Sequence, residues 1–197
     1  MLGIFLDQET TGLDSRKHAV IEVAFQVVDL AWGHPIANYS QVIAIGEKRW
    51  EERDPMSIMV NGFCWEEVAQ GKEMEQVSQQ IQEILTGASI RRGEAAFICQ
   101  NPSFDRPFFA QLVDTYTQEK LFWPYHWLDL ASMYWALKVQ QWPKAEVFSL
   151  NEGDLSKDAI AKATGLPAEK KPHRAMRGVE HLILCYQKIV NFPSSQA

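Results

Sequence analysis

Two carboxylates spaced two residues apart are the first candidates for chemistry in this chain. Asp7 and Glu9 follow the short apolar run of residues 2–6. Because side chains alternate along a strand, this spacing points both carboxylates to the same face. Carboxylates held that close repel each other unless cations lie between them, and hard oxygen ligands suit Mg²⁺ or Mn²⁺. Taken alone, such a pair is more often two solvated acids at a strand-to-turn junction, with residues 10–12 making the turn.

Two further candidates lie much later in the chain. Asp105 follows the apolar run of residues 95–99, and His173 precedes an amphipathic segment. Asp105 could provide another metal ligand or could cap the helix that follows it. His173 could exchange protons near neutral pH or could be an exposed loop residue beside Pro172. Around it lies an island of positive charge that suits phosphate contacts or a solvated loop equally well, made by Lys170, Lys171, Arg174 and Arg177.

The hydrophobic pattern indicates the elements that must position these residues. Apolar and alternating runs predict strands over residues 2–6, 19–30, 39–45 and 95–99. Helical spacing predicts helices over about 74–85, 106–116, 128–139 and 157–164, with a last helix whose apolar face runs from 179 to 190. Ser156 is a candidate N-cap and Gly165 a candidate C-terminal stop. Three early strands followed by alternating helices and strands predict an α/β domain with a mixed sheet.

Several segments, in this order, resemble one family. They are Phe5–Leu13 (FLDQETTGL), Val20–Ala24 (VIEVA), Gln100–Asp105 (QNPSFD), Trp127–Leu130 (WLDL) and Leu155–Val190, which contains His173-Arg174-Ala175. They resemble the motifs of the DEDDh, or DnaQ-like, 3′–5′ exonucleases, which include the proofreading subunit of DNA polymerase III. The resemblance implies a ribonuclease H-like mixed sheet flanked by helices. It also implies an exonuclease domain over residues 1–192, followed by a short tail over 193–197.

The resemblance further implies a two-metal hydrolysis of phosphodiester bonds at single-stranded DNA or RNA 3′ ends. Two Mg²⁺ or Mn²⁺ ions would lie roughly 4 Å apart. Asp7 would bind both ions, Glu9 the nucleophile-side ion and Asp105 the second ion, while His173 would act as general base. The expected substrate contacts come from Thr10, Thr11, Gly12, Leu13, Asn101 and Arg174. A polymerase or a second copy of the chain is a further expected partner.

One position departs from the family pattern. The third motif of the family reads His-x-Ala-x-x-Asp, whereas the segment that begins at His173 ends at Gly178. The missing aspartate is a ligand of the nucleophile-side ion, and glycine has no side chain to replace it. The sequence therefore leaves two hypotheses open: a weakened exonuclease, or a non-catalytic relative that binds nucleic acid ends or a polymerase. We expect Gly178→Asp to restore the ligand without harm to the helix, since glycine is a poor helix former.

Composition restricts the remaining possibilities. The chain has 197 residues, 46% of them hydrophobic, and a formal net charge of −6. This charge argues against a broad basic surface of the kind that coats nucleic acid. The three cysteines, Cys64, Cys99 and Cys185, are far apart, which predicts free, buried thiols in a reducing compartment. The N-terminus lacks the pattern of a signal peptide, so we expect a cytoplasmic protein with no membrane partner.

Overall fold

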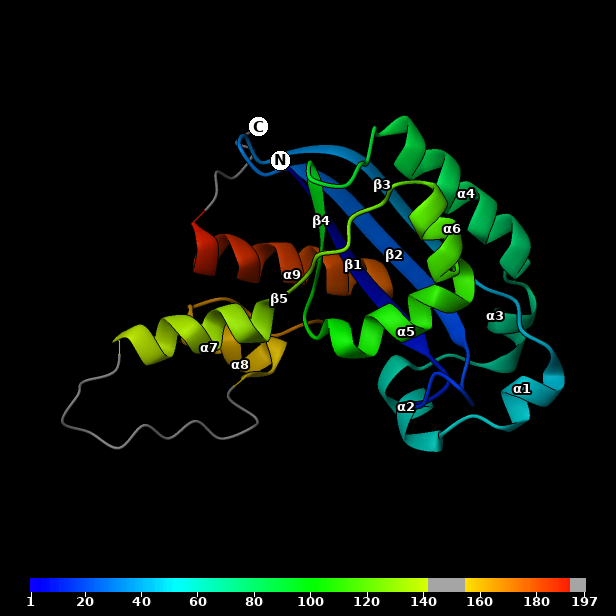
Figure 1. Ribbon diagram of the computed structural model, residues 1–197. Helices are drawn as coiled ribbons and strands as arrows, with labels where there is room; N and C mark the ends of the chain where they lie inside the picture. The colour runs from blue at the N-terminus through cyan, green and yellow to red at the C-terminus, as the bar shows by residue number, and fades with distance from the viewer. Residues whose placement is uncertain (142–154, 192–197) are drawn as a thin grey trace.

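A mixed five-stranded sheet forms the centre of the molecule (Figure 1). The computed structural model describes residues 1–141 and 155–191 of the protein. The strand order is β3-β2-β1-β4-β5, with β1 antiparallel to β2, β2 antiparallel to β3, and parallel pairing of β1 with β4 and of β4 with β5. The strands are β1 (Leu2–Thr10), β2 (Val20–Asp29), β3 (His34–Val42), β4 (Ala95–Cys99) and β5 (Trp127–Asp129).

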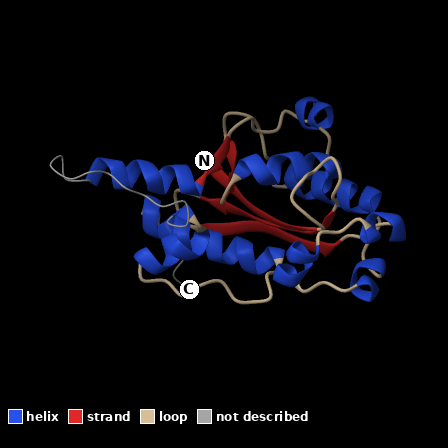
Figure 2. Ribbon diagram, turned by 90° about the horizontal axis from the view of Figure 1, so that it is seen from below, coloured by secondary structure: helices blue, strands red, loops and turns tan. Residues whose placement is uncertain are grey.

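Helices cover both faces of the sheet, which lies between two helical layers in Figure 2. In Figure 1, α4, α5 and α6 lie on one side of the strands and α7, α8 and α9 on the other. The helices in the described residues are α1 (Glu47–Glu51), α2 (Pro55–Asn61), α3 (Trp65–Ala69), α4 (Met74–Gly87), α5 (Pro102–Leu112), α6 (Thr115–Lys120), α7 (Leu130–Gln141), α8 (Lys157–Ala163) and α9 (Ala175–Val190). This arrangement confirms the predicted ribonuclease H-like α/β fold.

The central strand β1 contributes to a separate core on each face. Ile4 and Leu6 pack into the cluster that includes α4 and α5, whereas Phe5 packs into the cluster that includes α7, α8 and α9. Side chains two residues apart share a face, so Asp7 and Glu9 lie on the same face as Phe5. The alternation of β1 therefore directs both carboxylates towards α8 and α9.

Strand β1 is longer than its apolar run predicts. Its ladder with β2 continues through the pair Asp7–Ala24 and the pair Glu9–Glu22, with a register irregularity between Glu9 and Thr10. The carboxylates therefore lie within the strand and not beyond its end. Because both belong to a paired backbone, their positions are fixed more firmly than a strand-to-turn junction would allow.

Other predicted boundaries were wrong in ways that local chemistry explains. The helix predicted over 106–116 is instead two helices, because Pro102 starts α5 and the Asp114 carboxylate accepts backbone hydrogen bonds that start α6. The third strand is His34–Val42 and not 39–45, since the ladder begins directly after the turn at Gly33, whose φ is 71°. The short helices α1, α2 and α3 carry too little periodicity to be predicted; with β2 they bury a small third core.

Several local predictions were confirmed. Strand β4 has the predicted bounds, and the Ser156 hydroxyl accepts the backbone N–H of Ala159 at the start of α8. Gly165 follows α8 with φ 75°. The three cysteines are free, and Cys99 and Cys185 are buried as predicted, whereas Cys64 is exposed. As a separate finding, no helix in the described ranges is long and apolar enough to cross a membrane. Residues 193–197, predicted to form a tail, lie outside the described residues.

Candidate active site

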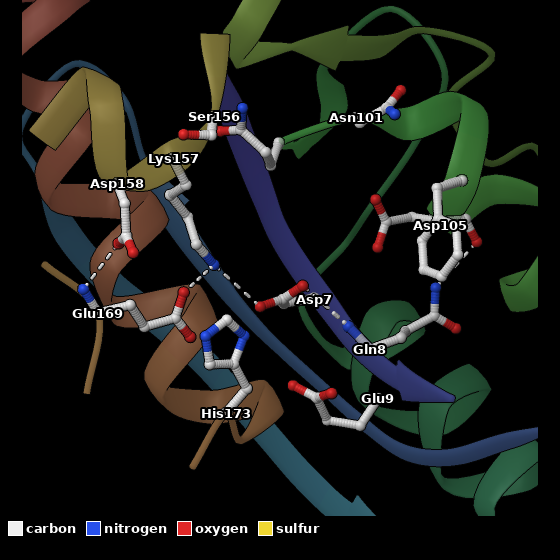
Figure 3. A pocket seen from close by; sticks show the side chains of 12 residues that line it. Asp7, Gln8, Glu9, Asn101, Asp105, Ser156, Lys157, Asp158, Glu169 and His173 are labelled. Atoms are coloured by element: carbon white, nitrogen blue, oxygen red, sulfur yellow. Dashed lines mark hydrogen bonds and ion pairs between the residues drawn. The ribbon is translucent and has the colours of Figure 1, made fainter. Parts of the chain in front are cut away.

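The four residues proposed for catalysis line one cavity of about 380 Å³. Asp7 and Glu9 come from β1, Asp105 from the first turn of α5, and His173 from the segment before α9. In Figure 3 the side chains of Asp7, Glu9 and His173 point towards one another, with Asp105 across the cavity. Its volume is within the range of small-ligand sites, about 300–1,000 Å³. The fold thus brings together four side chains that are up to 166 residues apart in the chain.

Hydrogen bonds to the backbone hold two of these residues, or the segments that carry them, in place. The Gln8 side chain, on the face of β1 opposite to Asp7, donates to the Asp105 backbone carbonyl at 2.8 Å. At the start of α9, a carboxylate oxygen of Glu22 accepts the backbone N–H of Ala175 at 2.7 Å. Since Ala175 is two residues after His173, this contact fixes the segment that carries the imidazole. Glu22 lies opposite Glu9 in the ladder and is buried.

The predicted substrate contacts divide into two groups. Asn101 lines the main cavity, while Thr10 and Leu13 line a second cavity of about 170 Å³ that shares Gln8, Glu9 and Phe104 with the first. The remaining predicted contacts line neither cavity.

Those remaining residues have contacts of a structural kind. The Thr11 hydroxyl accepts the Ala19 backbone N–H at 2.9 Å, and Gly12 packs so closely on His18 that a Cβ atom there would meet the ring. Arg174 forms a two-bond ion pair with Glu67, at 2.7 and 3.1 Å. Its guanidinium also lies 3.8 Å from the centre of the Phe63 ring. A role of Arg174 in substrate binding therefore remains a prediction, and it would require this side chain to share or leave these partners.

A cation inside the acidic cluster was not predicted from the sequence. The Lys157 ammonium lies 3.2 Å from Asp7 Oδ2 and 2.7 Å from Glu169 Oε2 (Figure 3). It also donates to the backbone carbonyl of Gly178 at 3.3 Å. Lys157 and Glu169 belong to segments whose sequence suggests only a helix start and a loop. In the structure, Lys157 is the first residue of the short helix α8, which packs against α9, and Glu169 follows that helix.

Gly178 provides the space for this arrangement. A Cβ atom at Gly178 would overlap Asp7 Oδ2, lie 2.6 Å from Asp7 Cγ and lie 3.1 Å from the Lys157 ammonium. The expectation that Gly178→Asp does not harm the helix stays a prediction, but Asp7 would first have to turn away from Lys157. Helix propensity, on which that expectation was based, ignores what faces the glycine.

Burial and mutual repulsion raise the pKa values of three acids in the cavity. Burial, with Asp7 and Glu22 nearby, raises the pKa of Glu9 to about 8. Burial and the charge of Asp7 raise the pKa of Asp105 well above its ordinary value. Burial also raises the pKa of Asp7, although Lys157 partly opposes this. For Lys157 itself, burial disfavours the charge, but Asp7 and Glu169 outweigh it and raise its pKa. The cavity thus gathers carboxyl groups whose negative charges are disfavoured by burial and by one another.

Comparisons with known proteins agree on the fold. No protein-family model matches the chain, and no curated protein sequence does. Among solved structures, cell-death related nuclease 4 (CRN-4) is 16% identical with a TM-score of 0.70, covering 96% of this chain and 64% of its own. Exonuclease I of E. coli, solved with a dT13 oligonucleotide, is 16% identical with a TM-score of 0.72, covering 96% and 41%.

A third solved structure extends the likeness to a protein that recognises RNA. A 3′-exonuclease described as recognising the 3′ end of a histone mRNA stem-loop is 10% identical, with a TM-score of 0.72, covering 96% of this chain and 81% of its own. This chain spans only 64% of CRN-4 and 41% of Exonuclease I, so those proteins contain further segments. The chain therefore has the ribonuclease H-like fold found in these nucleases.

Proposed function

We propose that this protein is a 3′–5′ exonuclease that hydrolyses phosphodiester bonds at single-stranded nucleic acid ends. The observation that supports this best is the convergence of Asp7, Glu9, Asp105 and His173 on one cavity. The fold is compatible with that activity, because the solved structures it resembles are nucleases. The second cavity, which Thr10 and Leu13 line beside the main cavity, offers a place for the terminal nucleotide.

The residues present fit one divalent ion better than the two that the resemblance implies. The charge of Asp7 raises the pKa of Asp105, which shows that the two acids repel each other when both are ionised. A cation between them would relieve that repulsion. Mg²⁺ is commonly held by one or two carboxylates together with substrate phosphates. On the Gly178 side, however, Lys157 already engages Asp7. Within residues 1–141 and 155–191, no three His, Cys, Asp or Glu side chains are grouped so that they could hold a metal ion.

Each residue then has a distinct role in the proposed reaction. A divalent ion bound by Asp7 and Asp105 would supply positive charge to the scissile phosphate. The His173 imidazole would accept a proton from the attacking water, and general bases of this kind contribute about 10²–10⁴-fold to a rate. Its backbone N–H donates to the Val60 carbonyl at 3.2 Å, which holds the base at the cavity wall. Asn101, at the start of α5, would contact the strand.

The test is a hydrolysis assay on 5′-labelled single strands of DNA and of RNA, with Mg²⁺ or Mn²⁺ titrated separately. We expect stepwise shortening from the 3′ end by the wild-type protein. Asp7→Asn should abolish it, whereas Glu75→Gln, an exposed acid in the first turn of α4, should leave it unchanged. Equal activity of wild type and Asp7→Asn would contradict the proposal, because it would indicate a contaminating nuclease or another site.

One observation favours a second candidate function, a non-catalytic domain that binds single-stranded 3′ ends. Lys157 neutralises Asp7 without any ion, and an ammonium cannot activate water as a divalent ion can. This candidate predicts that a labelled strand binds the wild-type protein tightly and stays intact at every concentration of Mg²⁺ and Mn²⁺. Binding is measured by fluorescence anisotropy and integrity on a gel from the same sample.

A further inference from the structure

The environment of Lys157 is that of an organised internal cation. Its side chain is only 13% exposed, and Glu169, its nearest partner, is 2% exposed. A charge removed from water to this extent is costly unless it is paired and hydrogen-bonded. The three donors of the ammonium match the three acceptors in contact with it, namely Asp7 Oδ2, Glu169 Oε2 and the Gly178 carbonyl. No donor remains for a phosphate oxygen, so this lysine is suited to neutralise the site and not to grip the substrate.

Lys157 and Gly178 also depend on each other. Any side chain at 178 would begin 3.1 Å from the ammonium and would overlap the carboxylate that it binds. An aspartate at 178 and the observed Asp7–Lys157 contact are therefore mutually exclusive in this geometry. The lack of a side chain at 178 therefore goes together with the buried lysine. The Lys157 ammonium occupies the space beside Asp7 that a side chain at 178 would need.

We propose that the Lys157 ammonium takes the place of one divalent ion beside Asp7, so that this site accepts one ion fewer than it would without the lysine. The proposal rests on the proposed function only in treating the cavity as the place where phosphodiesters bind. Asp7 and Asp105, which line the same cavity, would hold the remaining ion. Lys157 acts here as a positioning residue: it holds Asp7 and removes the need for a second ion.

The experiment counts bound Mn²⁺ ions by isothermal titration calorimetry, a readout that needs no hydrolysis. The variants are Lys157→Met, which keeps much of the apolar length without the charge, and Lys157→Met/Gly178→Asp, which adds the carboxylate. The matched control is Lys162→Met, an exposed lysine on the same helix α8. Circular dichroism with and without Mn²⁺ verifies that each protein is folded.

We expect the double variant to bind one more Mn²⁺ ion than the wild type, and Lys162→Met to bind the same number as the wild type. Lys157→Met alone, which lacks the added carboxylate, should bind Mn²⁺ at Asp7 with an affinity at least of the order of 10-fold above that of the wild type. If the double variant is unfolded without ions, the single variant carries the test. Equal numbers and affinities in wild type and both variants would overturn the proposal.

The outcomes separate this proposal from the proposed function. A gain of one ion in the double variant supports the role of Lys157 even if no protein hydrolyses a strand, in which case only the exonuclease proposal fails. Hydrolysis by the wild type together with an unchanged ion number in both variants retains the exonuclease proposal and rejects the role of Lys157.

Discussion

Replacing Gly178 with alanine tests the packing of the site through the sign of its effect on stability. In an ordinary helix interior, Gly→Ala stabilises by about 1 kcal/mol, because glycine loses more backbone entropy and alanine is the best helix former. At Gly178 the new methyl group would overlap Asp7 Oδ2, so Asp7 must turn and lose its contact with Lys157. A hydrogen bond to a charged group contributes about 1.5–3 kcal/mol. The net expectation is a loss of about 0.5–2 kcal/mol in the free energy of unfolding.

The measurement is equilibrium unfolding in urea at pH 7 with a metal chelator present. Gly87→Ala is the control, because Gly87 is the last residue of α4 and a Cβ atom there would have no neighbour within 4 Å. The control should be unchanged or slightly more stable than the wild type. If Gly178→Ala were more stable than the wild type by about 1 kcal/mol, the close contact between Asp7 and the helix would be refuted.

Three further predictions address the acids and the base. For Glu9, the folded protein holds a proton up to about pH 8 that the unfolded chain releases near 4.5, so without divalent ions stability should fall as pH rises between these values. Urea unfolding should show a flatter pH profile in Glu9→Gln, and a parallel profile would contradict the burial of Glu9. Glu22→Ala should lower the free energy of unfolding by about 1–3 kcal/mol, since the Ala175 N–H loses its acceptor, and an unchanged urea midpoint would show that this contact is unimportant. His173→Ala should slow strand hydrolysis by about 10²–10⁴-fold, with a full rate arguing against a general base there.

The part of the site that sequence could predict is the part that local rules determine. The shared face of Asp7 and Glu9 follows from strand alternation, and the N-cap at Ser156 follows from its hydroxyl and position. The family resemblance suggested Asp105 and His173, because both stand in short motifs that follow the order of the family's motifs along the chain.

The part that sequence could not predict depends on docking between distant segments. Lys157 and Asp7 are 150 residues apart in the chain. They meet because α8 packs against the face of β1 that carries Asp7. Glu169 looks like an ordinary loop acid until the fold places it 2.7 Å from the ammonium. Helix propensity could not show what Gly178→Asp would meet, because the obstacle is a side chain on another element. Helix periodicity missed the division between α5 and α6, where Asp114 caps a new helix directly after the apolar end of α5.

The proposed hydrolysis of single strands from a 3′ end, by the cavity of Asp7, Asp105 and His173, can be measured with two substrates. The protein is incubated with a linear single strand and with the same sequence closed into a circle, in Mg²⁺ and in Mn²⁺. We expect the linear strand to be shortened one nucleotide at a time from its 3′ end and the circle to stay intact. Asp105→Asn should slow the shortening at least of the order of 100-fold. Cleavage of the circle at the same rate, or an unchanged linear strand in both ions, would contradict the proposed hydrolysis.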